Sequence, residues 1–211
     1  MLGIIGAMEV EVATLKSAIN NLEVTKKAGM EFCMGNIFGK DVVVVKSGIG
    51  KVNAAICTQI LVDDFQVDGV INTGVAGSLN NDINICDIVI STEALEHDMD
   101  VTPLGYEKSV IPDMETSVFK ADKRLMEVAK KSAKEAELDV KIFEGKVVSG
   151  DQFIGTAEKK KYLRDQIWRR LCGNGRGINC PCSILKQHSI FGNKSYFRQS
   201  RWRCRNGLSN I

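Results

Sequence analysis

The amino-acid sequence predicts an α/β domain, because short runs rich in valine and isoleucine alternate with longer segments of helical period. The chain has 211 residues, of which 44% are hydrophobic and 26% charged, so it can bury a sizeable core. None of its apolar runs approaches the roughly 18 residues of a membrane-spanning helix. The composition therefore excludes fibrous proteins, wholly disordered proteins and integral membrane proteins.

Six strands are expected in the first 166 residues, each an apolar run bounded by turn residues. They are Leu2–Ile5, Phe32–Ile37, Val42–Ser47, Gly69–Thr73, Asp87–Leu95 and Lys146–Ser149. Apolar residues at helical spacing predict three helices between them, at Val10–Ile19, Val52–Phe65 and Lys120–Ala136. In the third helix, Leu125, Val128, Ala129 and Ala133 share one face, which we expect to be buried. The dipeptides Asn20-Asn21 and Ala28-Gly29 predict turns.

The charge of the chain changes abruptly near residue 166. Residues 1–166 hold all 26 acidic residues and 19 Lys or Arg, a net charge of −7. Residues 167–211 hold nine basic residues and no acid, together with both tryptophans and four of the seven cysteines. The sequence therefore divides into a globular domain, 1–166, and a basic, acid-free tail, 167–211.

The tail permits several interpretations. A basic arm for nucleic acid would use Tyr196, Phe197 and Trp202 as stacking platforms, but the tail has no repeat and no RGG pattern. A zinc site is less favoured still, because the tail cysteines lack the paired spacing of zinc ligands. A third interpretation is that the tail is not a natural sequence.

The termini and cysteines bear on location. Residues Met1–Gly6 have no basic lead-in and no long apolar core follows them, so neither a signal peptide nor a transit peptide is expected. Seven cysteines, an odd number without framework spacing, favour a reduced, cytoplasmic chain.

Four polar or glycine-rich turns follow predicted strands, at 6–11, 47–51, 72–78 and 149–154. Ligands of α/β sheets bind beyond the carboxyl ends of the strands, and glycine lets a ligand approach the backbone closely. The same glycines can serve simply as turns, and Glu9 and Glu11 can simply complement a helix dipole. The turns at 47–51 and 72–78 lack the patterns of nucleoside triphosphate and dinucleotide sites.

Five motifs stand in register along the chain: GIIGAMEVE at 3–11, KSGIGKVNAA at 46–55, INTGVAG at 71–77, HDMDVT at 97–102 and VSGDQFI at 148–154. Together they closely resemble the 5′-methylthioadenosine/S-adenosylhomocysteine nucleosidase family. The resemblance spans residues 1–166 and implies a nucleoside phosphorylase-like three-layer α/β fold with a central mixed sheet. It also implies a homodimer with no cofactor and no metal. Neither a membrane nor a nucleic acid is expected as a partner.

The implied activity is hydrolysis of the N-glycosidic bond of methylthioadenosine or S-adenosylhomocysteine, which releases adenine and the 5-thioribose product in methionine salvage. By this resemblance, Glu11 is the carboxylate that activates the attacking water. Phe153 matches the aromatic residue that stacks on adenine, and the backbone of Ile154 reads the edge of the purine. Seven further residues are implied to surround the substrate: Val75 and Gly77 beside ribose and base, Ala7, Met8 and Ile49 in the pocket wall, and Val101 and Leu104 in a lid across the dimer interface.

Two alternatives stay open. A purine nucleoside phosphorylase must bind a phosphate dianion and so needs arginine near its glycine loops. Residues 1–166 contain only Arg124 and Arg164, both on predicted surface helices, which favours water as the nucleophile. A chain from another functional class would bind adenine through Phe153 and Ile154 without catalysis, or bind nucleic acid through the tail.

Two motifs of the family are missing from the tail. V-E-M-E-G-A supplies a methionine and a glutamate beneath the ribose, and I-S-D supplies the aspartate that protonates N7 of the leaving adenine. Codons for Cys172–Pro181, when shifted by one nucleotide, can encode V-E-M-E-G-A-S-I-A, and those for Ser189–Ser200 can encode the second motif. We therefore hypothesise a one-base insertion near Ile167. The fold would then be incomplete at its C-terminal end, and the chain as written would have little or no activity.

Overall fold

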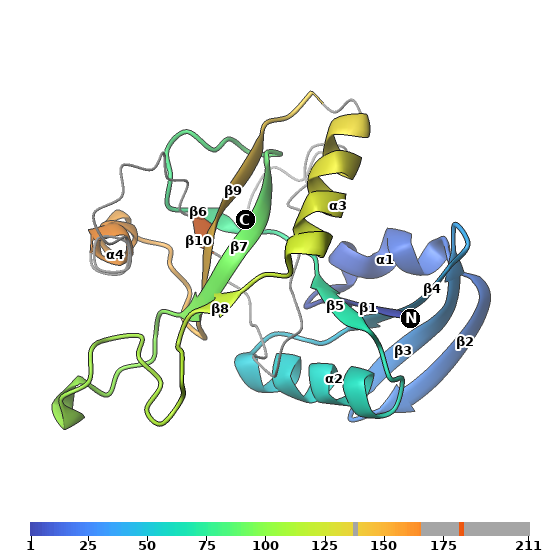
Figure 1. Ribbon diagram of the computed structural model, residues 1–211, viewed down its shortest axis with the longest axis horizontal. Coiled ribbons are helices and arrows are strands. Elements are labelled where there is room, and N and C mark those ends of the chain that lie inside the picture. The colour runs from blue at the N-terminus through green and yellow to red at the C-terminus, as the bar shows by residue number, and fades with distance from the viewer. Residues whose placement is uncertain (137–138, 166–181, 184–211) are drawn as a thin grey trace.

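The computed structural model describes residues 1–136, 139–165 and 182–183, and within them two five-stranded sheets form (Figure 1). The first sheet has the order β2-β3-β4-β1-β5. Its strands are β1 (Leu2–Gly6), β2 (Asn20–Lys27), β3 (Met30–Ile37), β4 (Lys40–Lys46) and β5 (Gly69–Asn72). The strands β4, β1 and β5 are parallel, whereas β2 and β3 are antiparallel to their neighbours. The sheet is therefore mixed, as the family resemblance implies.

The second sheet has the order β6-β10-β9-β7-β8 and is also mixed. Its strands are β6 (Gly77–Ser78), β7 (Ile88–Glu96), β8 (Phe119–Lys120), β9 (Ile142–Ser149) and β10 (Cys182–Ser183). The long strands β7 and β9 run parallel, so their carboxyl ends reach the same edge. The predicted central sheet is thus divided into two sheets.

Two helices cover opposite faces of the first sheet because side chains alternate along a strand. Val42 and Val44 of β4 pack with Val12 of α1 (Glu9–Ser17). Val43 and Val45 instead pack with the buried side of α2 (Lys51–Asp63). All four valines are less than 5% exposed. Figure 1 shows α1 and α2 on the two sides of this sheet, which makes the three layers of the fold.

Two further helices belong to the second sheet. In α3 (Lys123–Glu135), Ala129 and Ala133 pack on Ile88 and Ile90 of β7. The short helix α4 (Ala157–Leu163) begins at Thr156, whose hydroxyl accepts a hydrogen bond from the Lys159 N–H at 3.2 Å. The sequence-based assignment of Val128 to the buried face of α3 is wrong, because that side chain is 56% exposed.

All six predicted strands and all three predicted helices are present, with ends that differ by a few residues. The predicted Ala28-Gly29 turn is confirmed as the link between β2 and β3. The predicted Asn20-Asn21 turn is wrong, because these residues begin β2. Asn21 nevertheless has a φ of 54°, and the register with β3 is irregular between Asn20 and Glu23.

The cysteines only partly follow the sequence-based expectation. Cys33 and Cys57 are free thiols in the core, and burial raises the pKa of Cys57 to about 12. Cys86 is disulfide-bonded, so the prediction of a wholly reduced chain is wrong at this residue. None of the helices in the described ranges has the length and apolar character needed to cross a membrane. The interpretations of the 167–211 tail lie outside the described residues, apart from Cys182 and Ser183 in β10.

Candidate active site

The Glu11 carboxylate joins two loops that follow strands of the first sheet. Its side chain is on the first turn of α1 and the residue is only 2% exposed. Oε2 accepts hydrogen bonds from the N–H groups of Ala7 at 2.9 Å and Met8 at 3.0 Å, and Oε1 accepts one from Val75 at 2.9 Å. A buried carboxylate is costly unless hydrogen-bonded, so these three bonds explain how the fold tolerates it. They also fix where both oxygens lie.

Backbone connections place this carboxylate at the edge of the sheet. The Ser47 N–H donates to the carbonyl of Gly6 at 2.9 Å, and the Thr73 N–H donates to that of Ile5 at 2.8 Å. The loops that follow β4, β1 and β5 therefore leave the sheet side by side. This edge is where α/β sheets hold their ligands.

Gly74 is required by the close approach of Glu11. A Cβ atom at position 74 would lie 2.6 Å from Cδ of Glu11, closer than real side-chain carbons come. A glycine there lets the backbone lie directly against the carboxylate. The INTGVAG motif thus has a direct physical role in this structure.

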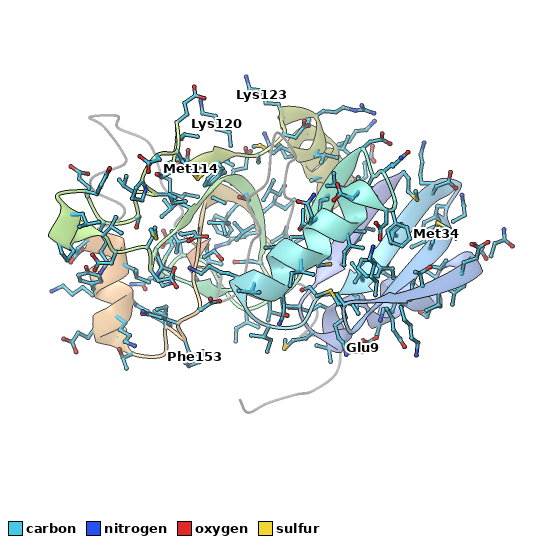
Figure 2. The ribbon with its side chains drawn as sticks, turned by 90° about the horizontal axis from the view of Figure 1, so that it is seen from below. Glu9, Met34, Met114, Lys120, Lys123 and Phe153 are labelled. Atoms are coloured by element: carbon cyan, nitrogen blue, oxygen red, sulfur yellow. The ribbon has the colours of Figure 1, made fainter. Side chains whose placement is uncertain are left out.

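The loop after β9 carries one exposed aromatic side chain, Phe153, and one buried aliphatic side chain, Ile154. Phe153 is 78% exposed and projects from the surface in Figure 2, whereas Ile154 is 4% exposed. Ile154 packs in a small core cluster with Leu79, Leu95, Val148 and Leu163. Burial of the neighbouring side chain thus holds the Phe153 backbone in place. Ile49, in the loop after β4, is 66% exposed.

The expected lid residues lie apart from Glu11. Val101 precedes the short 3-10 helix η1 (Thr102–Leu104), and Leu104 is 74% exposed. Figure 1 shows this segment projecting at the lower left, on the opposite side of the molecule from α1. Within one chain, these two residues are not brought to the carboxylate.

Known proteins resemble this chain over most of its length. The model of the phosphorylase superfamily matches residues 1–171. A 5′-methylthioadenosine/S-adenosylhomocysteine nucleosidase from Geobacillus sp. (strain WCH70) is 42% identical over 189 residues, which are 90% of this chain and 80% of the relative. The chain belongs to this nucleosidase family of the phosphorylase superfamily.

Solved structures of the nucleosidase family share the fold. The enzyme from Colwellia psychrerythraea, in complex with adenine, has a TM-score of 0.78 and 37% identity, covering 88% of this chain and 72% of that one. The enzyme from Neisseria meningitidis, in complex with methylthio-immucillin-A, has a TM-score of 0.82 and 30% identity, covering 93% of this chain and 82% of that one. The predicted nucleoside phosphorylase-like fold is thereby confirmed.

Within this family member, the predicted site residues fall into three groups. Ala7, Met8 and Val75 contact Glu11 through their backbone N–H groups, and Gly77 follows as the first residue of β6. Ile49, Phe153 and Ile154 lie on the loops after β4 and β9. Val101 and Leu104 lie on the projecting segment. Their roles toward substrate stay predictions.

The sequence analysis missed an ion-pair cluster that links three of these loops. Lys51 Nζ lies 2.9 Å from Asp98 Oδ1 and 3.2 Å from Glu96 Oε2. The other oxygen of Asp98 accepts a hydrogen bond from the Asp151 N–H at 2.8 Å. Burial opposes the charge on Lys51, but the bonds to Asp98 and Glu96 outweigh it and raise the pKa of Lys51. Lys51, Asp98 and Asp151 lie inside the five sequence motifs, and that position is the one signal the sequence offers for them.

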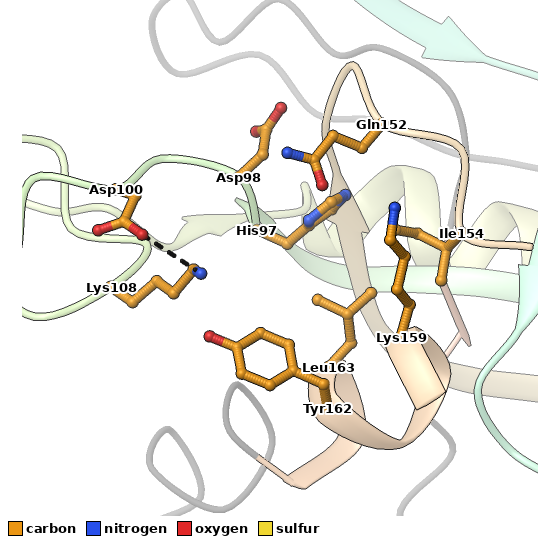
Figure 3. A pocket seen from close by; sticks show the side chains of 9 residues that line it. All are labelled: His97, Asp98, Asp100, Lys108, Gln152, Ile154, Lys159, Tyr162 and Leu163. Carbon is orange, nitrogen blue, oxygen red and sulfur yellow. Dashed lines mark ion pairs between the residues drawn. The ribbon is translucent and has the colours of Figure 1, made fainter. Parts of the chain in front are cut away.

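A cavity of about 230 Å³ lies beside this cluster (Figure 3). Its lining residues are His97, Asp98, Asp100, Lys108, Gln152, Ile154, Lys159, Tyr162 and Leu163. Lys108 pairs with Asp100 at 3.3 Å, and its ammonium lies 4.9 Å from the centre of the Tyr162 ring. His97 is 3% exposed, and Nε2 has no hydrogen-bond partner among the described residues. Burial lowers the pKa of His97, so its neutral form is favoured.

The described part of the chain brings no three His, Cys, Asp or Glu side chains into a group that could hold a metal ion. Arg124 is exposed on α3, and Arg164 follows the last residue of α4. Neither arginine lies on the loops around Glu11. The arrangement around Glu11 suits activation of water by a carboxylate better than capture of a phosphate dianion.

Proposed function

We propose that this chain's domain hydrolyses the N-glycosidic bond of 5′-methylthioadenosine and S-adenosylhomocysteine, a reaction of methionine salvage. The observation that carries the proposal is the buried Glu11 carboxylate, held by three backbone N–H groups where β1 and β5 end. Family membership supplies the substrate class. We expect the enzyme to act in the cytoplasm.

The proposed reaction needs a base on one side of the sugar and a held purine on the other. Glu11 takes one proton from water, and the remaining hydroxide forms a bond to the anomeric carbon of the thioribose. The bond from that carbon to N9 breaks, and its electron pair leaves with adenine, which takes a proton at N7 from the I-S-D aspartate of a frame-restored chain or from solvent in the chain as written. Phe153 stacks on the adenine while the Ile154 backbone bonds its edge. Neither a metal nor a cofactor takes part in the proposed reaction.

Release of adenine from methylthioadenosine, with and without phosphate, tests the reaction class. A hydrolase releases adenine and the free thioribose at a rate that does not depend on phosphate. A phosphorylase would need phosphate and would form a sugar 1-phosphate. Detection of that phosphate ester would refute the proposal.

A second copy of the chain is part of the proposal, because Val101 and Leu104 do not reach Glu11 of their own chain. Leu104 is 74% exposed, so its burial against a partner would be favourable. Sedimentation of the parent and of Leu104→Asp tests this. We expect a dimer for the parent and a weaker dimer for the variant. A parent that sediments as a monomer at assay concentration would refute the proposal that Val101 and Leu104 of a second copy form the lid.

The tail limits the proposed activity. Residues 167–211 contain no aspartate or glutamate, so they cannot supply the aspartate that protonates N7. Loss of a general acid lowers a rate by roughly 10²- to 10⁴-fold. We attribute the tail to a one-base insertion near Ile167. Resequencing of the coding DNA tests this, and the absence of an alternate frame for V-E-M-E-G-A would refute it.

The same acid-free tail favours one second candidate, a chain that binds adenine without hydrolysing the nucleoside. Equilibrium dialysis of adenine against the chain as written separates the two. Saturable binding without turnover would support this second candidate for the written chain.

A further inference from the structure

We infer that Asp98 is a positioning residue: it holds the adenine-binding loop after β9 at a fixed position relative to Glu11. This inference rests on the proposed function. The unit concerned consists of Lys51, Asp98 and Asp151, and we call it the loop clamp. It lies outside the carboxylate site itself, and its side chains need no contact with substrate.

The loop clamp is a closed ring of three hydrogen-bonded residues. The Asp98 carboxylate accepts from Lys51 Nζ through Oδ1 at 2.9 Å and from the Asp151 N–H through Oδ2 at 2.8 Å. The Asp151 carboxylate in turn accepts from the Lys51 N–H at 2.8 Å. Each residue therefore bonds both of the others.

The three residues come from three segments that are distant in the sequence. Lys51 opens α2 after β4 of the first sheet, whereas Asp98 and Asp151 follow β7 and β9 of the second sheet. The bonds span 47, 53 and 100 residues along the chain. The loop clamp therefore ties the edge of one sheet to the edge of the other.

This tie matters because the two halves of the proposed site belong to different sheets. Glu11 is fixed to the loops after β1 and β5 in the first sheet, and Phe153 follows β9 in the second. Hydrolysis requires the activated water and the held purine to keep one geometry, and small displacements are costly to rate. Asp151 is two residues from Phe153, so the loop clamp acts next to the purine-binding ring.

Burial and a glycine show that the loop clamp is tightly built. The side chain of Asp98 is 9% exposed and that of Lys51 24%. A Cβ atom at Gly150 would lie 2.7 Å from Cγ of Asp98, so the strand end packs directly against this carboxyl group. The Lys51–Asp98 bond is part-buried, and a charge-assisted hydrogen bond there is stronger than one in water, whereas the two bonds to Asp151 are exposed.

Glu96 offers a matched control. Its carboxylate also bonds Lys51 Nζ, at 3.2 Å, and is 19% exposed, but the contacts described for it do not include Asp151. Glu96→Gln thus weakens an ion pair of the same lysine while the ring of three residues persists. Asp98→Ala removes two of the three hydrogen bonds of the ring, those to Lys51 Nζ and to the Asp151 N–H. Asp98→Asn keeps an acceptor for the Asp151 N–H but loses the negative charge.

Amide hydrogen exchange of the full-length chain tests the positioning without requiring turnover. We expect exchange in peptides covering 149–155 to rise about tenfold or more in Asp98→Ala, less in Asp98→Asn, and little in Glu96→Gln. Peptides covering β1 and β4 should keep their protection in all three. Equal exchange at 149–155 in the parent and Asp98→Ala would overturn the inference. A uniform loss over the core strands in both Asp98 variants would also overturn it, because Asp98 would then only stabilise the fold.

Adenine affinity completes the test by equilibrium dialysis of the same proteins. We expect about a tenfold weaker dissociation constant for Asp98→Ala, partial rescue in Asp98→Asn, and the parent value for Glu96→Gln. Unchanged affinity beside raised exchange would overturn the positioning role while the proposed function stands. A parent that neither binds adenine nor releases it from nucleoside would overturn the proposed function, and with it this role of Asp98.

Discussion

The Val75 N–H donates a 2.9 Å hydrogen bond to Oε1 of Glu11, although 64 residues separate the two in the sequence. This bond joins the loop after β5 to the carboxylate of α1. Together with the bonds from Ala7 and Met8, it holds both carboxylate oxygens through main-chain groups. Backbone groups therefore position the proposed base.

Glu11→Gln should abolish most of the activity while the neighbouring Glu9→Gln should not. The glutamine cannot take a proton from water, so we expect kcat for adenine release to fall roughly 10²- to 10⁴-fold in a frame-restored chain. Glu9 is exposed and pairs with Lys16 at 3.0 Å, so its loss should leave kcat near the parent value. Equal kcat values for the two variants would show that Glu11 is not the base that activates water.

Gly74→Ala should displace Glu11, whereas Gly69→Ala should be tolerated. The new Cβ at 74 would clash with the carboxylate, and overpacking of this kind costs about 1–3 kcal/mol in the free energy of unfolding. A Cβ at Gly69 would meet Leu2 at an ordinary 3.5 Å. Urea unfolding and adenine release measure both effects. A stable, fully active Gly74→Ala would show that the close approach is unnecessary.

Phe153→Ala should weaken adenine binding without destabilising the protein. The ring is 78% exposed, so its removal costs little packing. Stacking of a base on an aromatic ring contributes about 1–3 kcal/mol, which corresponds to roughly a 5- to 150-fold rise in the dissociation constant. Equilibrium dialysis and thermal unfolding report the two quantities. If affinity stays at the parent value, Phe153 does not stack on the base.

His97 should make the protein less stable in mild acid. Burial lowers its pKa below 6.5, with Lys51 and Lys108 acting in the same sense and Asp98 opposing them. The unfolded chain therefore binds a proton more readily, so the stability that His97 contributes is complete above about pH 6.5 and is lost as the pH falls toward the folded pKa. The free energy of unfolding should decline less between pH 7.5 and pH 5, roughly, in His97→Gln than in the parent. Parallel declines would show that His97 titrates as in the unfolded chain.

The sequence predicts elements well where buried side chains leave an apolar pattern and poorly where the residues are exposed. The run Val42–Val45 is buried on both faces, and its apolar character identifies β4. All eight residues of β2 are exposed, so no apolar pattern marks that strand, and Asn20-Asn21 is misread as a turn. Val128 has helical spacing but faces solvent, because the face of α3 that packs on β7 is narrow and built from Ala129 and Ala133.

The candidate site is predictable where one loop carries the signal. The glycine turn after β1 draws attention to two acids on the helical turn that follows, Glu9 and Glu11, and the resemblance to the nucleosidase family singles out Glu11. The loop clamp is not predictable in this way, because Lys51, Asp98 and Asp151 meet only when two sheets are assembled. A single sequence holds no record of contacts that span 47 to 100 residues.

The central claim is tested most directly by adenine release from methylthioadenosine. The rate is compared between the chain as written and the frame-restored chain, whose coding DNA has one base removed near Ile167. We expect at least about a hundredfold faster release from the frame-restored chain, because it regains the proton donor for N7. Equal and substantial release by both chains would contradict the assignment of the tail. Release by neither would contradict the nucleosidase function itself.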